Sequence, residues 1–171
     1  MGAVMLIPDI NDLNLENVFC GAGSELDTSI ARSCASSLLV AVTHALSAAV
    51  LKNKDARKFP DVVTFGYFCR KANIKLVLQA MQNPARRRGW GIVVHVAPSN
   101  IPVNFAFSFL MGFLTGNVNY VRAPSVDAPQ IDIIVTAIDT LLNQPSFAGL
   151  AKRVKFFRCE RDSPALMNLV K

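Results

Sequence analysis

The sequence has few residues of the kinds that hold metal ions or form disulfide frameworks. Its 171 residues include four cysteines and two histidines, and no two cysteines form a C-x-x-C pair. Zinc sites use clusters of cysteine and histidine ligands at short spacings, so we expect no metal site. Scattered single cysteines are typical of a reducing compartment, and we expect a cytoplasmic protein.

Long apolar runs and a secretory leader are also missing. The longest apolar run, residues 38–51, contains Thr43, His44 and Ser47 and is shorter than the ~20 residues that span a bilayer. Asp9 and Asp12 interrupt the stretch where a leader would have its apolar core. We therefore expect no membrane span, and we interpret the apolar run as a core helix.

Acidic residues are the scarcer charge. The chain has 18 Lys and Arg against 12 Asp and Glu, a net charge of +6, which suits anionic ligands such as nucleotides. Nucleic acid is the competing ligand. The basic residues, however, are spread among apolar segments and are not gathered on one helix with interleaved aromatics, so we do not expect nucleic-acid binding.

The stretch 91–104 organises the rest of the chain. Residues 91–97 are apolar and mostly β-branched, without polar alternation, which predicts a strand buried on both faces, as in parallel sheets. Pro98 and Pro102 lack an amide hydrogen and Asn100 favours turns, so the chain must turn here. In open α/β sheets, ligands bind where strands end in this way.

The segments around this strand predict an α/β fold. Residues 103–115 are apolar and end at Gly116-Asn117, which predicts a buried helix. From residue 91 the chain reads β-α-β-α-β with parallel strands, a partial Rossmann-like sheet. The later predicted elements are a strand at 117–124, a helix at 127–142 and a strand at 154–159. The earlier ones are helices at 27–51, 60–68 and 74–82 and a linker at 83–89. We expect a helical amino-terminal region over 1–85 and a partial nucleotide-binding domain over 86–171.

Three short motifs follow one another in this region: Pro98-Ser99-Asn100-Ile101-Pro102, Leu114-Thr115-Gly116-Asn117 and Val121-Arg122-Ala123-Pro124-Ser125. Together they resemble the first nucleotide-binding segment of the aldehyde dehydrogenase superfamily, and more closely its acyl-CoA reductase branch, the type found in bacterial luminescence fatty-acid reductase. Upstream, 59–63 and 67–73 resemble the helical region that precedes this segment. The resemblance covers roughly 38–171 and implies reduction of fatty acyl-CoA to aldehyde with NADPH.

The resemblance implies a role for the turn after the first strand. Asn100 matches the asparagine whose side-chain amide donates to the developing oxyanion. The alternative is an asparagine that merely caps the following helix. Ala97, Pro98 and Ser99 match positions whose backbone lies beside the nicotinamide ribose and the phosphates.

The end of the second strand matches the adenosine side of the cofactor site. Arg122 stands at or beside the position of the superfamily lysine that hydrogen-bonds the adenosine ribose, and Ser125 is expected close to the same ribose. A guanidinium pairs bidentately with a 2′-phosphate, which favours NADP over NAD. The alternative is an arginine at a strand end that faces solvent.

Other reactive or aromatic residues have simpler interpretations. Cys159 falls inside the third strand pattern, and the family nucleophile lies in a separate catalytic domain, so we do not expect Cys159 to be that nucleophile. We interpret His95 as a core histidine with satisfied ring nitrogens, and Trp90 and Tyr120 as packing residues. The three arginines 86–88 read as a solvated connector, with contact to a phosphate of cofactor or CoA as the alternative.

The resemblance also implies that a longer reductase is involved. The rest of the sheet and the cysteine-bearing catalytic domain would come from a missing segment or a partner chain, and an oligomer of this chain is a further expectation. The alternative is a non-catalytic α/β module for binding or assembly, in which an exposed sheet edge pairs with another chain.

Overall fold

The structure, a computed structural model, describes residues 18–20, 33–81, 83–160 and 162–169. Its sheet has the strand order β1-β4-β3-β2. Three strands are parallel: β2 (Ile92–Val96), β3 (Val118–Arg122) and β4 (Val154–Phe157). The predicted helical region followed by a partial Rossmann-like β-α-β-α-β sheet is therefore confirmed. A short strand that we did not predict, β1 (Val18–Cys20), runs antiparallel to β4.

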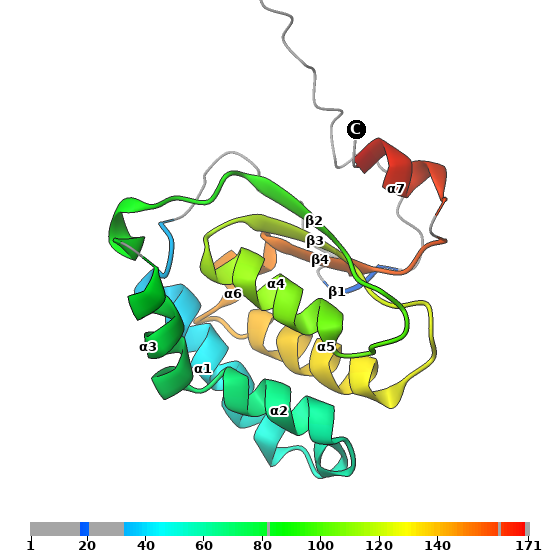
Figure 1. The fold of residues 1–171 in the computed structure, drawn as a ribbon, viewed down its shortest axis with the longest axis horizontal. Helices are drawn as coiled ribbons and strands as arrows, with labels where there is room; N and C mark the ends of the chain where they lie inside the picture. Colours follow the sequence, from blue (N-terminus) through cyan, green and yellow to red (C-terminus); the bar gives the residue numbers. More distant parts are fainter. Residues whose placement is uncertain (1–17, 21–32, 82, 161, 170–171) are drawn as a thin grey trace, which may run out of the picture.

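Helices cover one face of the sheet in two layers (Figure 1). The first layer contains α4 (Asn104–Leu114), which joins β2 to β3, and α5 (Pro129–Leu142), which joins β3 to α6 (Ala148–Ala151) and β4. The second layer contains α1 (Ser37–Lys52), α2 (Pro60–Phe68) and α3 (Lys71–Ala80), with the 3₁₀ turn η2 (Asp55–Lys58) between α1 and α2. On the other face, Leu166 of α7 (Pro164–Leu169) packs against β3 and β4.

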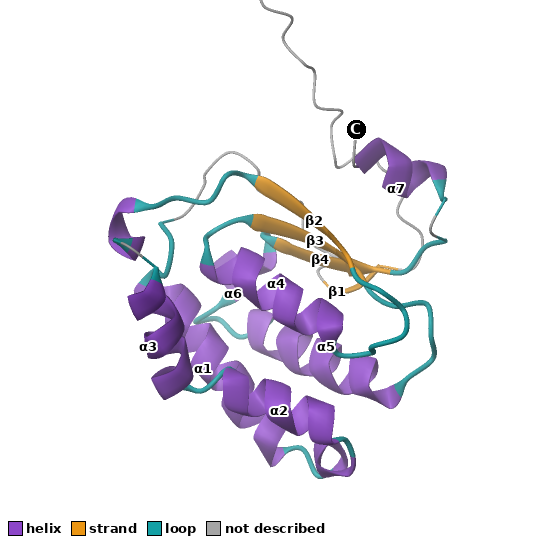
Figure 2. Cartoon of the chain, in the orientation of Figure 1, coloured by secondary structure: helices purple, strands orange, loops and turns teal. Residues whose placement is uncertain are grey.

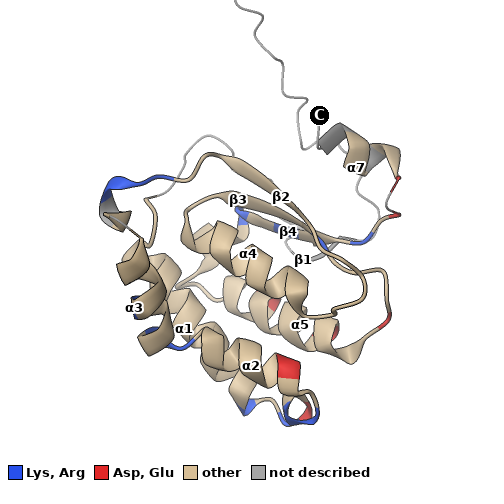
Figure 3. Cartoon of the chain, viewed as in Figure 1, with Lys and Arg blue, Asp and Glu red and all other residues tan. Residues whose placement is uncertain are grey.

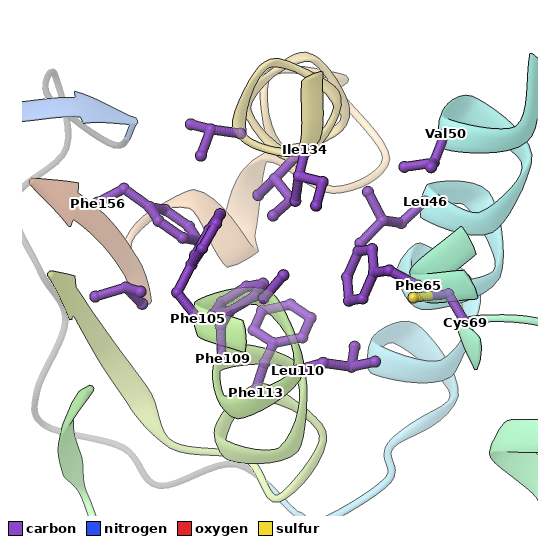
Figure 4. Packing of buried hydrophobic residues seen from close by; sticks show 14 of the residues in the cluster. Leu46, Val50, Phe65, Cys69, Phe105, Phe109, Leu110, Phe113, Ile134 and Phe156 are labelled. Carbon is purple, nitrogen blue, oxygen red and sulfur yellow. The ribbon is translucent and has the colours of Figure 1, made fainter. Parts of the chain in front are cut away.

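The first helical layer packs on the sheet through aromatic side chains (Figure 4). Phe105 and Phe109, four residues apart on α4, lie on one face of the helix and meet Phe156 of β4 edge to face, with ring centroids 5.9 and 5.0 Å apart. Such pairs add about 0.5–1.5 kcal/mol each beyond their burial. The apolar run from 103 to 115 thus forms the predicted buried helix, and it ends at Gly116 with φ of 84°.

The second layer packs closely on the first. The predicted core helix is confirmed: α1 buries Leu39, Leu46 and Val50. The Ser47 hydroxyl donates to the Gly66 carbonyl of α2 at 2.7 Å, so a polar group on α1 is satisfied by the neighbouring helix. In the part of the chain that the structure describes, no helix is both long enough and apolar enough to cross a membrane.

The predicted helix over 27–51 is wrong in its first part. Helix α1 begins at Ser37, because Ser33 forms a β-bridge with Arg88 and Ala35 has a left-handed φ of 54°. The Ala35 amide donates to the Leu114 carbonyl at 2.8 Å, which holds this bend against α4. Residues 27–32 lie outside the described residues.

The prediction that the first strand is buried on both faces is also wrong. β2 is the outermost strand of the described sheet, and Val96 is 48% exposed. Trp90, interpreted as a packing residue, is 99% exposed, whereas Tyr120 in the interior strand β3 is fully buried as predicted. The burial of these residues depends on the position of their strand in the sheet, which the apolar pattern of the sequence does not show.

Candidate functional site

The predicted site residues lie at the carboxyl edge of the parallel strands. Val96, the last residue of β2, pairs with Arg122, the last residue of β3, and Arg122 pairs with Phe157 of β4. The loops that lead to α4 and α5 therefore leave the same edge of the sheet (Figure 2). This edge is where open α/β sheets bind ligands.

The loop after β2 presents an exposed amide. Ala97 is buried, while Pro98, Ser99 and Asn100 are exposed. The N-cap position of α4 is Val103, and no side-chain hydrogen bond caps this helix. The alternative role of Asn100 as a helix cap is therefore wrong, and its amide lies at the sheet edge in contact with solvent.

The end of β3 carries a buried arginine. Arg122 is only 5% exposed, and its Nε donates to the Cys159 carbonyl at 2.9 Å. One of its terminal nitrogens donates to the exposed Ser125 hydroxyl at 3.0 Å. The structure thus brings Arg122 and Ser125 together, and the alternative of a solvent-facing arginine is wrong. Among the described residues the ion pairs are Lys58–Asp55 and Arg158–Asp132, so no described carboxylate neutralises this guanidinium.

The described cysteines differ in their environments. Strand β4 ends at Phe157, so Cys159 lies beyond the strand in which we expected it, as a half-buried free thiol. Burial raises the pKa of the Cys69 thiol to about 12. Burial also raises the pKa of Cys34, although the positive charge of Arg87 opposes this. Neither buried thiol has the thiolate character that a nucleophile needs.

His95 has partners for both ring nitrogens, which confirms its interpretation as a satisfied core histidine. Its Nδ1 lies 2.8 Å from the Ser108 hydroxyl on α4, and its Nε2 lies 3.0 Å from Oδ1 of Asn119 on β3. The Asn119 amide nitrogen donates to the Asn117 carbonyl, which orients its oxygen toward His95. The histidine proton therefore sits on Nε2, and Nδ1 accepts from Ser108.

This network links β2, α4 and β3 beneath the candidate site. Burial lowers the pKa of His95, and the hydrogen bond to Asn119 partly opposes that shift. Sequence reasoning missed Ser108 and Asn119 as its partners. A usable signal was present, because a histidine inside an apolar strand must find polar partners on the next helix or strand.

Within the described ranges, no group of three or more His, Cys, Asp or Glu side chains is placed to hold a metal ion. The chemistry open to the candidate edge is therefore carried by an amide, a guanidinium and hydroxyl groups.

Comparison with known proteins bears on what this edge does. Residues 77–154, a little under half of the chain, match the family model of acyl-CoA reductase (LuxC). Over this segment the chain is similar to acyl-CoA reductase (LuxC). It contains both loops of the candidate edge, and the predicted resemblance to this type of reductase is confirmed. No curated protein and no solved structure matches the chain.

The match to the LuxC family indicates a class of reaction. The family implies acyl-CoA reductase activity on an acyl-CoA substrate, a reaction that generally uses a nicotinamide cofactor. The match runs from α3 through β2, α4, β3 and α5 to the first residue of β4. The family segment and the β-α-β-α-β unit that positions the candidate residues are thus nearly the same part of the molecule.

Proposed function

We propose that this chain supplies part of an NADPH site and an oxyanion-stabilising amide for the reduction of fatty acyl-CoA to aldehyde. The observation that supports this most is the common edge at which the exposed Asn100 amide and the Arg122–Ser125 pair leave adjacent parallel strands. We assign this role to the partial nucleotide-binding domain 86–171, with 1–85 as a supporting helical region.

Asn100 would act on the oxygen of the reacting carbonyl. When a thiolate attacks an acyl thioester, negative charge develops on that oxygen, and a preorganised amide N–H stabilises it. Prolines 98 and 102 restrict the backbone of the turn that carries Asn100. Cys34 and Cys69 are buried, and the resemblance places the nucleophile in a separate catalytic domain, so we propose that the attacking thiolate comes from a catalytic segment or a partner chain.

Residues of both loops would hold the cofactor. Bound NADPH supplies a hydride to the acyl carbon. The backbone of Ala97, Pro98 and Ser99 would lie beside the nicotinamide ribose and phosphates. The Arg122 guanidinium donates to the exposed Ser125 hydroxyl and has no ion pair with a described carboxylate, which suits the phosphorylated adenosine ribose of NADP. The donors at this edge therefore fit a phosphorylated dinucleotide.

Calorimetric titration with NADPH and NADH tests the cofactor site. We expect NADPH to bind the unmodified chain, and Arg122→Ala to weaken binding about tenfold, because a charge-assisted hydrogen bond is lost. Asn100→Ala should leave NADPH affinity within about twofold, since its amide acts on the substrate oxygen. NADH should bind more weakly than NADPH and should respond less to the Arg122 change.

Because Arg122 is buried, folding must be checked separately. Circular dichroism and thermal unfolding of each variant identify any loss of structure, and Ser125→Ala probes the same contact from an exposed position. Lack of NADPH binding, or equal binding by a folded Arg122→Ala variant, would contradict the assignment.

One observation favours the alternative, a non-catalytic assembly module. Strand β2 is the last strand of the described sheet, and Val96 on it is 48% exposed. Such an edge can pair with a strand of another chain. Association of the chain that persists when Asn100 and Arg122 are substituted, without any nucleotide binding, would support this function.

A further inference from the structure

A fully exposed tryptophan stands just before β2. Trp90 is 99% exposed and is the only tryptophan in the chain. Its backbone is nevertheless fixed, because the amides of Trp90 and Gly91 both donate to Oδ1 of Asn117, at 2.7 and 3.3 Å. Aromatic side chains usually contribute to stability by being buried. An exposed indole on a fixed backbone contributes little to folding stability, but its faces are accessible to a ligand.

The glycines on either side explain why the chain can take this path. A Cβ at Gly89 would clash with the Gly116 carbonyl oxygen, so only glycine allows this close approach of the two backbones. Gly91 has a φ of +125°, which side-chain-bearing residues rarely adopt. The backbone around Trp90 is therefore held against the α4–β3 turn while the indole remains outside.

Three exposed arginines precede the tryptophan. Arg86 ends the turn η3 (Pro84–Arg86), and Arg87 and Arg88 follow it. The Arg87 carbonyl accepts from the Cys34 amide at 2.9 Å, and Arg88 forms the β-bridge with Ser33, so this segment is also anchored. Figure 3 shows the basic loop at one end of the molecule, away from the acidic residues that it colours on α2, on α5 and near α7. We call residues 86–90 the basic–aromatic loop.

We propose that the basic–aromatic loop binds the 3′-phosphoadenosine diphosphate end of CoA. This inference rests on the proposed function, in which acyl-CoA is the substrate. Guanidinium groups pair with phosphate oxygens through charge-assisted hydrogen bonds, and an adenine ring stacks on an exposed indole. Arginine charge and a free aromatic face beside each other match both parts of this ligand.

The position of the loop fits the length of the substrate. The loop lies at the start of β2 and Asn100 follows its end, and five strand residues span about 17 Å. β2 is the outermost strand of the described sheet, so its outer backbone groups are available to the amides of a pantetheine arm, as in strand addition. CoA bound at the loop would thus direct its thioester along β2 toward the candidate oxyanion amide.

NADP carries a related phosphorylated adenosine diphosphate, with the phosphate on the 2′ position. The proposed cofactor site lies at the opposite, carboxyl end of the strands, beside Arg122. We therefore assign the loop to CoA, and the experiment separates the two nucleotides by using adenosine 3′,5′-bisphosphate and CoA in one arm and adenosine 2′,5′-bisphosphate and NADPH in the other.

The sole tryptophan makes the loop observable in the full chain. Titration with CoA should quench and shift the Trp90 fluorescence, and adenosine 3′,5′-bisphosphate should reproduce the change. Calorimetry on the variants should show that the double change Arg86→Ala with Arg88→Ala weakens CoA binding about tenfold or more. Trp90→Ala should also weaken it about tenfold, whereas Trp90→Phe should retain part of the affinity because stacking persists.

The chain offers a matched control for loss of charge. Arg57→Ala with Lys58→Ala removes two exposed positive charges from η2, and it should leave CoA affinity within about twofold because distant exposed charges are screened. NADPH binding should be unchanged in the Arg86 and Arg88 double variant. If CoA binds and NADPH does not, the proposed cofactor site is contradicted and the loop assignment is not. If NADPH binds and CoA does not, the loop assignment is contradicted and the cofactor site is not.

Several results would overturn the inference. These are a Trp90 fluorescence that does not respond to CoA, an equal loss of affinity in the η2 control, or parallel loss of NADPH and CoA binding in the loop variants. Binding of anionic phospholipid vesicles that CoA does not compete away would instead make the loop a membrane contact. The proposal stands if CoA binding depends on Trp90 and the two arginines and NADPH binding does not.

Discussion

β2 and β3 pair with each other along five residues, yet they are buried to very different extents. β3 has the sequence Val-Asn-Tyr-Val-Arg, and all five residues are buried. β2 has the more apolar sequence Ile-Val-Val-His-Val, and only His95 is buried. The strand with more polar residues is the interior one, so burial in this sheet follows strand position and not hydropathy.

The polar residues of the interior strand are accommodated because each has partners. Asn119 bonds to His95 and to the Asn117 carbonyl, and Arg122 bonds to Ser125 and to the Cys159 carbonyl. An unsatisfied group at such positions would cost about 1–3 kcal/mol. On the edge strand the one buried polar residue, His95, has partners in the same way, while Val96 remains exposed for contacts with other molecules.

The largest expected effect is a difference in the free energy of unfolding when a valine is replaced by alanine on β3 and on β2. Val121→Ala removes a fully buried side chain from β3 and should lower the free energy of unfolding by about 2–3 kcal/mol, because a cavity remains. Val96→Ala on β2, where the side chain is 48% exposed, should cost about 0.5 kcal/mol or less. Urea unfolding measures both. Equal losses would mean that β2 is buried in solution.

A smaller effect is expected from the polar network. Asn119→Ala leaves the His95 Nε2–H and the Asn117 carbonyl without their partner, and should cost about 1–2 kcal/mol. Asn143→Ala is the matched control, because this exposed asparagine bonds only to Asp139 on the surface, and it should change stability by less than about 0.5 kcal/mol. A neutral Asn119→Ala variant would contradict the proposed link between the strands.

The smallest effect is a pH dependence from His95. Because burial lowers its pKa in the folded chain below the ordinary 6.5, the unfolded chain binds a proton first as the pH falls. Stability from this group is therefore complete above about pH 6.5 and decreases below it. Urea unfolding at about pH 7.5 and about pH 5.5 should show a smaller pH dependence in His95→Gln than in the unmodified chain.

The exposed His44 provides the control for this measurement. His44→Gln should retain the pH dependence of the unmodified chain. The same pH dependence in His95→Gln would show that other groups cause it.

Much of the fold could be predicted because the signals were local. The apolar run that became α4, the Gly116 that ends it and the apolar stripe of α5 depend on residues close together in the chain. The start of α1 could not be predicted, because a bridge from Ser33 to Arg88 and a hydrogen bond from Ala35 to Leu114 set it. The short strand β1 depends in the same way on pairing with β4.

In the candidate site, too, the features that depend on local sequence could be predicted, and those that depend on contacts between distant residues could not. The turn with Pro98, Asn100 and Pro102 at a strand end was predictable, since proline and asparagine restrict the backbone locally. The contacts of Arg122 with Ser125 and with Cys159 differ in kind: the first spans three residues, and the second joins residues 37 apart in the chain.

The order β2, α4, β3, α5 and β4, the place where the chain turns after β2, and the family to which residues 77–154 are similar could be predicted from the sequence alone. These features follow from backbone preferences and from the spacing of apolar residues. Only the tertiary structure decided that β2 lies at the edge, that Arg122 is buried beneath Ser125, and that Trp90 stands in solvent. The reason is that strand order and burial depend on pairings between segments far apart in the chain.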